Sequence, residues 1–107
     1  MNKVILLGNL TRDPELSFTP GGSPVCKFGM AVNRKYKKGD EWVDEPCFID
    51  ITVWGKSGEA CAEYLSKGSQ ALVDGRLQFS MWEDGGKKRS KLEVVANDVQ
   101  FIGGKKE

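Results

Sequence analysis

The segment from residue 47 to residue 54 constrains the fold most, because its side chains alternate strictly between two classes. A period of two is typical of a β-strand with one buried face and one solvent face. The even positions combine two large aromatic rings with an acid and a hydroxyl, so they are expected to face solvent. The odd positions are all apolar and are expected to face a core: Cys47, Ile49, Ile51 and Val53.

Similar signals predict four more strands. Residues 3–10 are largely apolar and end before a turn at Arg12-Asp13-Pro14. Alternation resumes at Val25 and is followed by a polar hairpin over residues 36–46, with its turn at Lys38-Gly39-Asp40. The last two strands are expected near residues 70–82 and 91–102, joined at Asp84-Gly85-Gly86. Gly75 interrupts the apolar side of the first of these, which indicates a bend or a bulge.

One helix is expected between the third and fourth strands, over residues 57–67. Ser57 has the chemistry of an N-cap, and Gly68 stands where a C-cap glycine is common. The order strand, strand, strand, helix, strand, strand is that of an OB-fold, an all-β, five-stranded Greek-key barrel with one short helix between strands 3 and 4. A chain of 107 residues suits one such domain, expected over residues 1–103, with 104–107 as a short tail.

Aromatic side chains on the solvent face are the main functional signal. Phe48 and Trp54 lie six residues apart, roughly 20 Å along a strand. Trp82 continues the polar register of the fourth strand, whereas Tyr36 has the parity of a core face and needs a bulge or a hairpin twist to join them. Trp42, among acidic residues, is a weaker candidate. Exposed rings can stack on unpaired bases, so these residues predict a single-strand binding surface; a core or protein-interface role is the alternative.

Charge is clustered although the net charge is only +1. Residues 27–38 hold five basic residues and no acid, residues 39–50 hold five acids and no base, and a second basic cluster surrounds Lys88. Asp50 would repel a phosphate, so it is expected to accept hydrogen bonds from base edges or to pair with a neighbouring cation. The candidates for phosphate contact are Arg34, Lys35, Lys37, Lys56, Lys67, Arg76, Lys87, Lys88 and Arg89.

Several function classes are disfavoured. The chain has no His, which removes Ser–His and Cys–His dyads and His-bearing metal sites. Its three cysteines match no common zinc spacing, and all three are expected to be buried in the core. We therefore expect no enzyme activity, no metal and no cofactor. The N-terminus lacks a signal peptide and no apolar run could span a bilayer, so we expect a cytoplasmic protein without membrane contact.

Longer motifs add a family resemblance. The stretches NKVILLGNLTRDPEL, TPGGSPV, FGMAVNR, FIDITVWGKSGEACAEYLSKGSQALVDGRL and EVVANDVQFIG cover most of positions 2–103. Together they resemble the N-terminal domain of the bacterial single-stranded DNA-binding protein family. The resemblance implies a homotetramer of OB-folds around which the strand wraps, and basic positions near DNA at Lys56, Lys67 and Arg76. The stacking positions that it implies are Tyr36, Phe48, Trp54 and Trp82.

The chain also departs from the family pattern. Ser80 and Met81 stand where several relatives carry Arg or Lys, and Asp50 stands where some relatives are basic, which leaves the phosphate path around strands 3 and 4 open. Family members continue into a disordered linker with an acidic tip that recruits replication and repair proteins. The sequence ends at residue 107 without such a tip, so these partners are expected only if the full-length protein has one.

The predicted function is non-sequence-specific binding and protection of single-stranded DNA in replication, recombination and repair, in association with the nucleoid. The mechanism is aromatic stacking combined with counterion release from phosphates. The alternative is an OB-fold replication or primosome accessory protein that acts mainly through protein contacts, with its aromatic residues buried between chains. An oligosaccharide-binding OB-fold also uses aromatic rings and stays open as a third reading.

Overall fold

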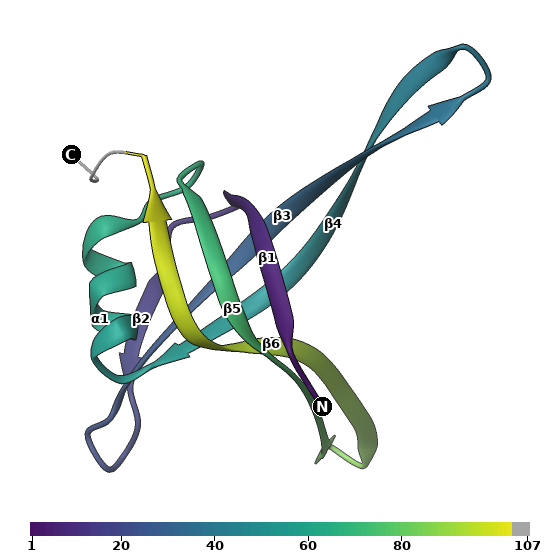
Figure 1. The fold of residues 1–107 in the computed structure, drawn as a ribbon. Coiled ribbons are helices and arrows are strands. Elements are labelled where there is room, and N and C mark those ends of the chain that lie inside the picture. Colours follow the sequence, from purple (N-terminus) through teal and green to yellow (C-terminus); the bar gives the residue numbers. More distant parts are fainter. Residues whose placement is uncertain (104–107) are drawn as a thin grey trace.

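The computed structural model describes residues 1–103, which form six strands and one helix (Figure 1). The predicted tail, residues 104–107, lies outside the described residues. The elements are β1 (Val4–Leu10), β2 (Glu15–Phe18), β3 (Pro24–Lys38), β4 (Glu41–Trp54), α1 (Gly55–Tyr64), β5 (Gln70–Asp84) and β6 (Lys87–Ile102).

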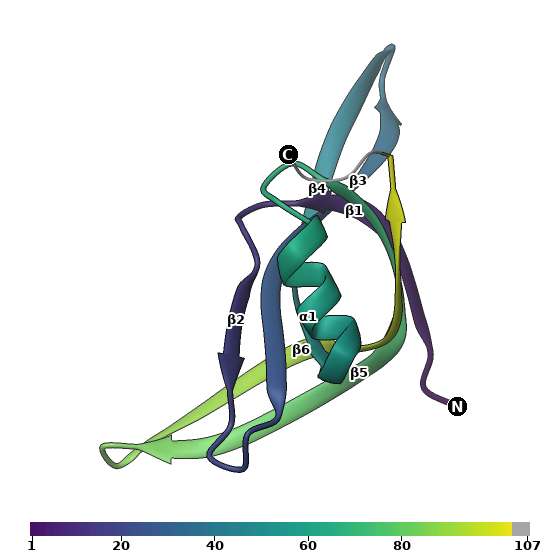
Figure 2. The ribbon, with the colours of Figure 1, turned by 90° about the vertical axis from the view of Figure 1, so that its left-hand side faces the viewer.

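Five of these strands close into a barrel. Neighbouring strands follow the order β1-β5-β6-β4-β3, and β1 meets β3 again through the pairs Asn9–Ala31 and Leu10–Met30. The β4–β6 pairing is parallel, starting at Ile51 opposite Val94, and the other pairings are antiparallel. The helix lies between the third and fourth barrel strands in chain order and across one opening of the barrel (Figure 2). The predicted OB-fold is therefore confirmed.

The short strand β2 is an addition that the sequence did not predict. It pairs with the outer edge of β3, with Leu16 opposite Cys26. All four of its residues are exposed. The strand therefore carries no burial alternation, and its conformation is set by the edge of β3 rather than by its own pattern.

The helix begins two residues earlier and ends three residues earlier than predicted. Its N-cap is Trp54, no side chain caps it, and Gly55 turns the chain directly out of β4 with a φ of +73°. Gly68 belongs to the return loop, where its N–H donates to the carbonyl of Leu10 at 2.8 Å. The N–H of Lys67 donates to the Asp13 carboxylate at 2.8 Å, so tertiary bonds rather than a C-cap fix this end.

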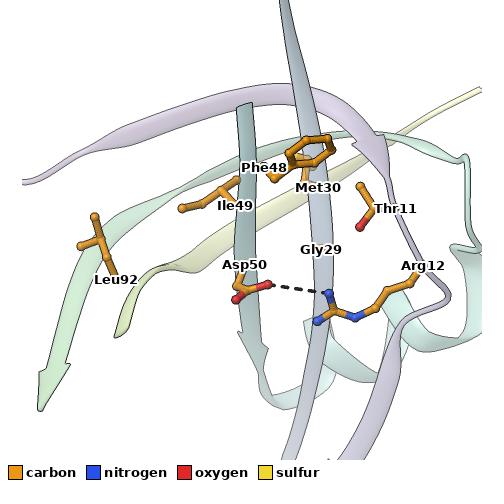
Figure 3. Close-up of a pocket in the computed structure, with 8 residues that line it drawn as sticks. All are labelled: Thr11, Arg12, Gly29, Met30, Phe48, Ile49, Asp50 and Leu92. Atoms are coloured by element: carbon orange, nitrogen blue, oxygen red, sulfur yellow. Dashed lines mark ion pairs between the residues drawn. The ribbon is translucent and has the colours of Figure 1, made fainter. Parts of the chain in front are cut away.

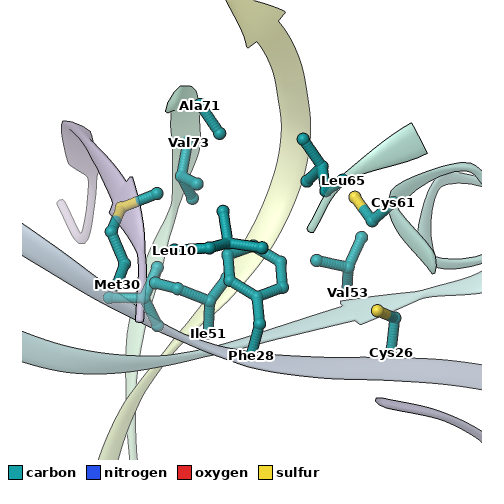
Figure 4. Close-up of a cluster of buried hydrophobic side chains, with 11 residues drawn as sticks. Leu10, Cys26, Phe28, Met30, Ile51, Val53, Cys61, Leu65, Ala71 and Val73 are labelled. Atoms are coloured by element: carbon teal, nitrogen blue, oxygen red, sulfur yellow. The ribbon is translucent and has the colours of Figure 1, made fainter. Parts of the chain in front are cut away.

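In β4 the core follows the predicted alternation, with one exception; on the predicted apolar side of β5, Ala71 and Val73 are buried but Leu77 and Phe79 are exposed. The β4 residues Ile51 and Val53 are fully buried and Ile49 is half-buried, but Cys47 is exposed. The expectation that Cys47 is buried is wrong because β4 pairs with β6 only from Ile51 onward, so Cys47 lies at an open end of the barrel, where it lines an apolar hollow with Val4 and Leu6. The buried cluster, most of which Figure 4 labels, is Leu10, Cys26, Phe28, Met30, Ile51, Val53, Cys61, Leu65, Ala71, Val73 and Val94.

Two long hairpins extend from the barrel and carry both basic clusters (Figure 1). The β3–β4 hairpin turns at Gly39, with a φ of +63°, and the β5–β6 hairpin turns at Gly85-Gly86, both with positive φ. The predicted irregularity at Gly75 is confirmed by a register shift between Asp74 and Gly75. No helix in residues 1–103 is long and apolar enough to cross a membrane.

Candidate nucleic-acid interface

Three exposed aromatic residues lie along the outer face of β4. Phe48 is 69% exposed and Trp54 is 49% exposed, as the alternation predicted. Trp42 is 71% exposed and shares their parity, so it also lies on this face. Its acidic neighbours made Trp42 the weaker candidate, but the even spacing of positions 42, 48 and 54 is the sequence signal that places it on this face. At about 3.3 Å per residue, successive rings lie roughly 20 Å apart along the strand.

Trp82 extends this face across the barrel onto β5. It is 45% exposed and pairs with Arg89. Lys91 and Glu93 follow Arg89 on the same face of β6, and both contact β4. Lys91 forms an ion pair with Asp50, and Glu93 accepts a hydrogen bond from Thr52 at 2.6 Å. Because alternate residues of a strand share a face, Trp82 lies on the same side of the sheet as Asp50 and Phe48.

Tyr36 occupies a different position. It is half-buried, and the Arg34 guanidinium lies 5.0 Å from the centre of its ring. The β3–β4 register is uninterrupted, so no bulge turns Tyr36 toward Phe48, and its parity is that of Met30 on the core side. An orientation of the Tyr36 ring toward Phe48 therefore depends on the twist of the hairpin arms, which cross in Figure 1.

A hollow of about 260 Å³ lies at the centre of this face (Figure 3). It opens next to the point where the pairing of β4 with β6 begins. One side is polar, with Thr11 and Arg12 from the loop after β1, and the other is apolar, with Phe48 from β4. Gly29 leaves room for the loop, since a Cβ there would lie 2.6 Å from the Arg12 guanidinium. The full lining is Thr11, Arg12, Gly29, Met30, Phe48, Ile49, Asp50 and Leu92.

Asp50 bridges two cations, Arg12 in the lining of this hollow and Lys91 on β6. Its Oδ1 lies 3.7 Å from Arg12 Nη1, and its Oδ2 lies 3.5 Å from Lys91 Nζ. The expectation that Asp50 pairs with a neighbouring cation is thus confirmed. The sequence predicts only a turn at Arg12, and no local pattern places its side chain here, because the contact depends on the closure of β1 against β3.

The predicted phosphate residues divide between the two hairpins and the barrel. Lys35 and Lys37 share the face of Trp42 and Phe48, and Lys88 lines a second hollow beside Trp82. Lys87 and Arg89 lie at the same hairpin tip as Lys88. Two of the cations have acidic partners: Arg34 with Glu45 at 2.9 Å, and Arg89 with Asp84 at 3.4 Å.

The remaining three predicted cations lie outside the central hollow. Arg76 is on β5 in the same row as Trp82, with its guanidinium 3.4 Å from Gln78 Oε1. Lys56 is exposed in the first turn of α1, two residues after Trp54. Lys67 is exposed in the loop beyond the helix. The structure therefore brings Arg76 toward the aromatic face and leaves Lys56 and Lys67 near the two ends of α1.

The cysteines offer no reactive centre on this face. Cys26 and Cys61 are buried, as predicted. Burial raises the pKa of the Cys26 thiol to about 11, and burial together with the nearby Cys26 raises the pKa of the Cys61 thiol to about 12. Within residues 1–103, no group of three or more His, Cys, Asp or Glu side chains is arranged to hold a metal ion.

Comparisons with known proteins agree with this architecture. Residues 1–102 match the model of the single-strand binding protein family. The chain is 48% identical over 103 residues to the single-stranded DNA-binding protein of Treponema pallidum, covering 96% of this chain and 58% of that protein. It is 49% identical over 104 residues to single-stranded DNA-binding protein 3 of Clostridium acetobutylicum, covering 95% and 71%.

A solved structure shows the same fold. A deletion mutant of the single-stranded DNA binding protein from Thermus aquaticus superposes with a TM-score of 0.86 at 28% identity, over 97% of this chain and 51% of that one. The chain spans 58% to 65% of the length of the curated relatives from Treponema pallidum, Wolinella succinogenes and Helicobacter hepaticus. With its closed barrel, its family match over residues 1–102 and these identities, the chain belongs to the single-strand binding protein family.

Proposed function

We propose that this chain binds single-stranded DNA with little sequence preference, by stacking unpaired bases on Phe48, Trp54 and Trp82. The observation that carries this proposal is the row of exposed aromatic rings on one face of β4 and β5, with basic residues at both hairpins. Each stacked base contributes about 1–3 kcal/mol, whatever its identity. Tyr36 is the fourth proposed stacking residue, on the support of the family resemblance and the hairpin twist.

The surface suits an unpaired strand rather than a duplex. The faces of duplex bases are covered by their neighbours, so rings standing on an open sheet face cannot reach them. Phosphates of the bound strand would be neutralised by the basic residues of the two hairpins and of the hollow between them. Each neutralised phosphate of a single strand contributes about 0.7 to the dependence of log affinity on log salt concentration.

In the cell, this binding would coat exposed strands during replication, recombination and repair, at the nucleoid. The family membership supports this role, and the action is occlusion of the strand rather than catalysis. Replication and repair proteins would be recruited only through an acidic tail of the full-length protein. The names of the relatives supply the ligand class, single-stranded DNA.

We further propose that the chain assembles as a homotetramer. Among the described residues, positions 4–8 of β1 pair with β5 on one edge, and β1 pairs with β3 only through Asn9 and Leu10. The free edge is flanked by the exposed apolar side chains of Ile5 and Leu7. An open edge with apolar neighbours is a template for pairing with a second chain. Light scattering after size-exclusion chromatography measures the mass directly.

The substitution Trp54→Ala tests the stacking proposal against the protein-docking alternative. We expect the affinity for an oligo(dT) strand, measured by fluorescence anisotropy of a labelled oligonucleotide, to fall by about 1–3 kcal/mol. Circular dichroism and thermal unfolding should match the unsubstituted protein. An unchanged affinity would contradict stacking at this position, and loss of the fold would assign Trp54 to packing instead.

A further inference from the structure

The hollow on the proposed DNA face already contains an anion, Asp50, which is paired with Arg12 in the lining and with Lys91 beside it. Asp50 presents one carboxylate oxygen to Arg12 Nη1 at 3.7 Å and the other to Lys91 Nζ at 3.5 Å. The two cations come from different elements, the loop after β1 and strand β6, and Figure 3 shows Arg12 reaching across Gly29 to the carboxylate. The structure thus has a site for one anion that offers two oxygens.

A phosphodiester has the same donor requirements as this carboxylate. It carries one negative charge shared by two non-bridging oxygens, and Arg and Lys are its usual partners. Phe48 lines the same hollow, so a base stacked on its ring would bring the adjoining phosphate close to Arg12. Asp50 and that phosphate would therefore compete for the same cations.

The existing ion pairs are suited to exchange. Both are longer than the 2.7–2.9 Å of a tight charge-assisted hydrogen bond. The side chains of Asp50, Arg12 and Lys91 are 45%, 47% and 35% exposed, so water and ions reach all three. Glu93 lies 3.9 Å from Lys91 and accepts a hydrogen bond from Thr52, so a second carboxylate stays beside Lys91 when Asp50 is displaced.

We propose that Asp50 is a built-in competitor of the DNA phosphate, which must displace its carboxylate from Arg12 and Lys91 when the strand binds. This rests on the proposed function and deepens it, because Asp50 then sets the affinity and the salt dependence of the same surface. Arg12 in the lining and Lys91 beside the hollow are then phosphate-contacting residues, and Asp50 is the residue that positions them in the free protein.

The test compares Asp50→Asn with the unsubstituted protein on oligo(dT) over a range of salt concentrations. Removing the competitor should tighten binding about three- to tenfold, since each exposed ion pair contributes little by itself. It should also steepen the log–log salt slope by about 0.7 to 1.4, because the displaced Asp50 carboxylate takes up cations from solution in the unsubstituted protein and so offsets part of the counterion release from one or two phosphates. The matched control is Asp74→Asn, which removes a similarly exposed carboxylate, 3.4 Å from Lys3, and should change neither quantity.

A second background separates displacement from general repulsion. In a protein that carries Arg12→Gln and Lys91→Gln, Asp50→Asn should no longer steepen the salt slope. A gain of the same size in both backgrounds would overturn the proposal, because Asp50 would then act only through its charge. Weaker or unchanged binding by Asp50→Asn would overturn it as well, and Asp50→Ser repeats the test if the Asn variant does not fold. Failure of the unsubstituted protein to bind oligo(dT) would instead reject the proposed function itself.

Discussion

Phe48 on β4 lies directly opposite Ala31 on β3, and the small partner leaves its ring 69% exposed. The neighbouring pair, Gly29 opposite Asp50, has no side chain at all on β3. A large ring beside such small partners has little to pack against within its own sheet. We infer that the ring of Phe48 is available to a ligand, because a side chain this exposed contributes little to the core.

Substitution of Phe48 by Ala should therefore weaken DNA binding and spare the fold. The expected loss is about 1–3 kcal/mol of affinity for oligo(dT), with the free energy of unfolding changed by no more than about 0.5 kcal/mol. Anisotropy titration and chemical denaturation measure the two quantities. Phe79→Ala is the control, because Phe79 is also exposed but lies on the other face of the β5–β6 hairpin from Trp82. Equal losses in both variants would contradict a stacking role for this face.

Trp42 should matter only for longer strands. It lies on the same face as Phe48 but six residues further along β4, in the hairpin arm. We expect Trp42→Ala to weaken binding of an oligo(dT) of about sixteen nucleotides and to leave binding of one of about eight unchanged, within the known range of sites on one OB-fold. Loss of affinity for both lengths, or for neither, would show that Trp42 does not extend the stacking path.

Gly75 should be required for the barrel itself. It lies at the register shift in β5, and a Cβ there would run into the backbone carbonyl of Val95. Gly75→Ala is expected to lower the free energy of unfolding by about 1–3 kcal/mol, as overpacking does. Gly21→Ala is the matched control, because the added methyl group would meet only Thr19 Oγ1 at 3.9 Å and should cost less than about 0.5 kcal/mol. Urea denaturation measures both variants, and equal midpoints would contradict the requirement for glycine at position 75.

The three thiols should react at very different rates. Cys47 is exposed, whereas Cys26 and Cys61 are buried with pKa values raised to about 11 and about 12. A colorimetric thiol reagent should label one cysteine quickly in the native protein and all three after unfolding. Rapid labelling of all three in the folded protein would contradict the core described above.

The same pKa values predict that the two buried thiols contribute to a loss of stability at alkaline pH. The unfolded chain ionises these two thiols near their ordinary pKa of 9.0, whereas the folded chain keeps them neutral to about 11 and 12. Their contribution is thus fully present below pH 9 and is lost as the pH rises from 9 to about 12. The midpoint of urea denaturation should fall over this range, and Cys26→Ser should make the fall shallower.

The barrel was predictable because most of its strands carry their own burial pattern. The alternation in Ile49, Ile51 and Val53 and the glycine at 75 each follow from local chemistry. Strand β2 and the ends of α1 do not. Their positions depend on partners far along the chain, as in the bond from Lys67 N–H to Asp13, so no local window contains the information.

The candidate site was predictable in its aromatic residues and not in its ion pairs. The alternation of β4 is enough to predict that Phe48 and Trp54 face solvent. Applied consistently, the same rule also predicts Trp42 on this face. Arg12 and Lys91 are almost eighty residues apart, and only barrel closure brings both to Asp50. Cys47 failed the same parity rule because β4 extends beyond its pairing with β6, so the inward side of Cys47 faces an open apolar hollow instead of a packed core.

Quenching of tryptophan fluorescence reports directly whether unpaired bases stack on the proposed face, since Trp42, Trp54 and Trp82 all lie on it. The protein should be titrated with oligo(dT) and with a duplex of equal length, each at two salt concentrations. We predict deep quenching by the single strand, little quenching by the duplex, and weaker binding at the higher salt concentration. Absence of quenching by either nucleic acid would contradict the stacking surface and favour a role in protein docking.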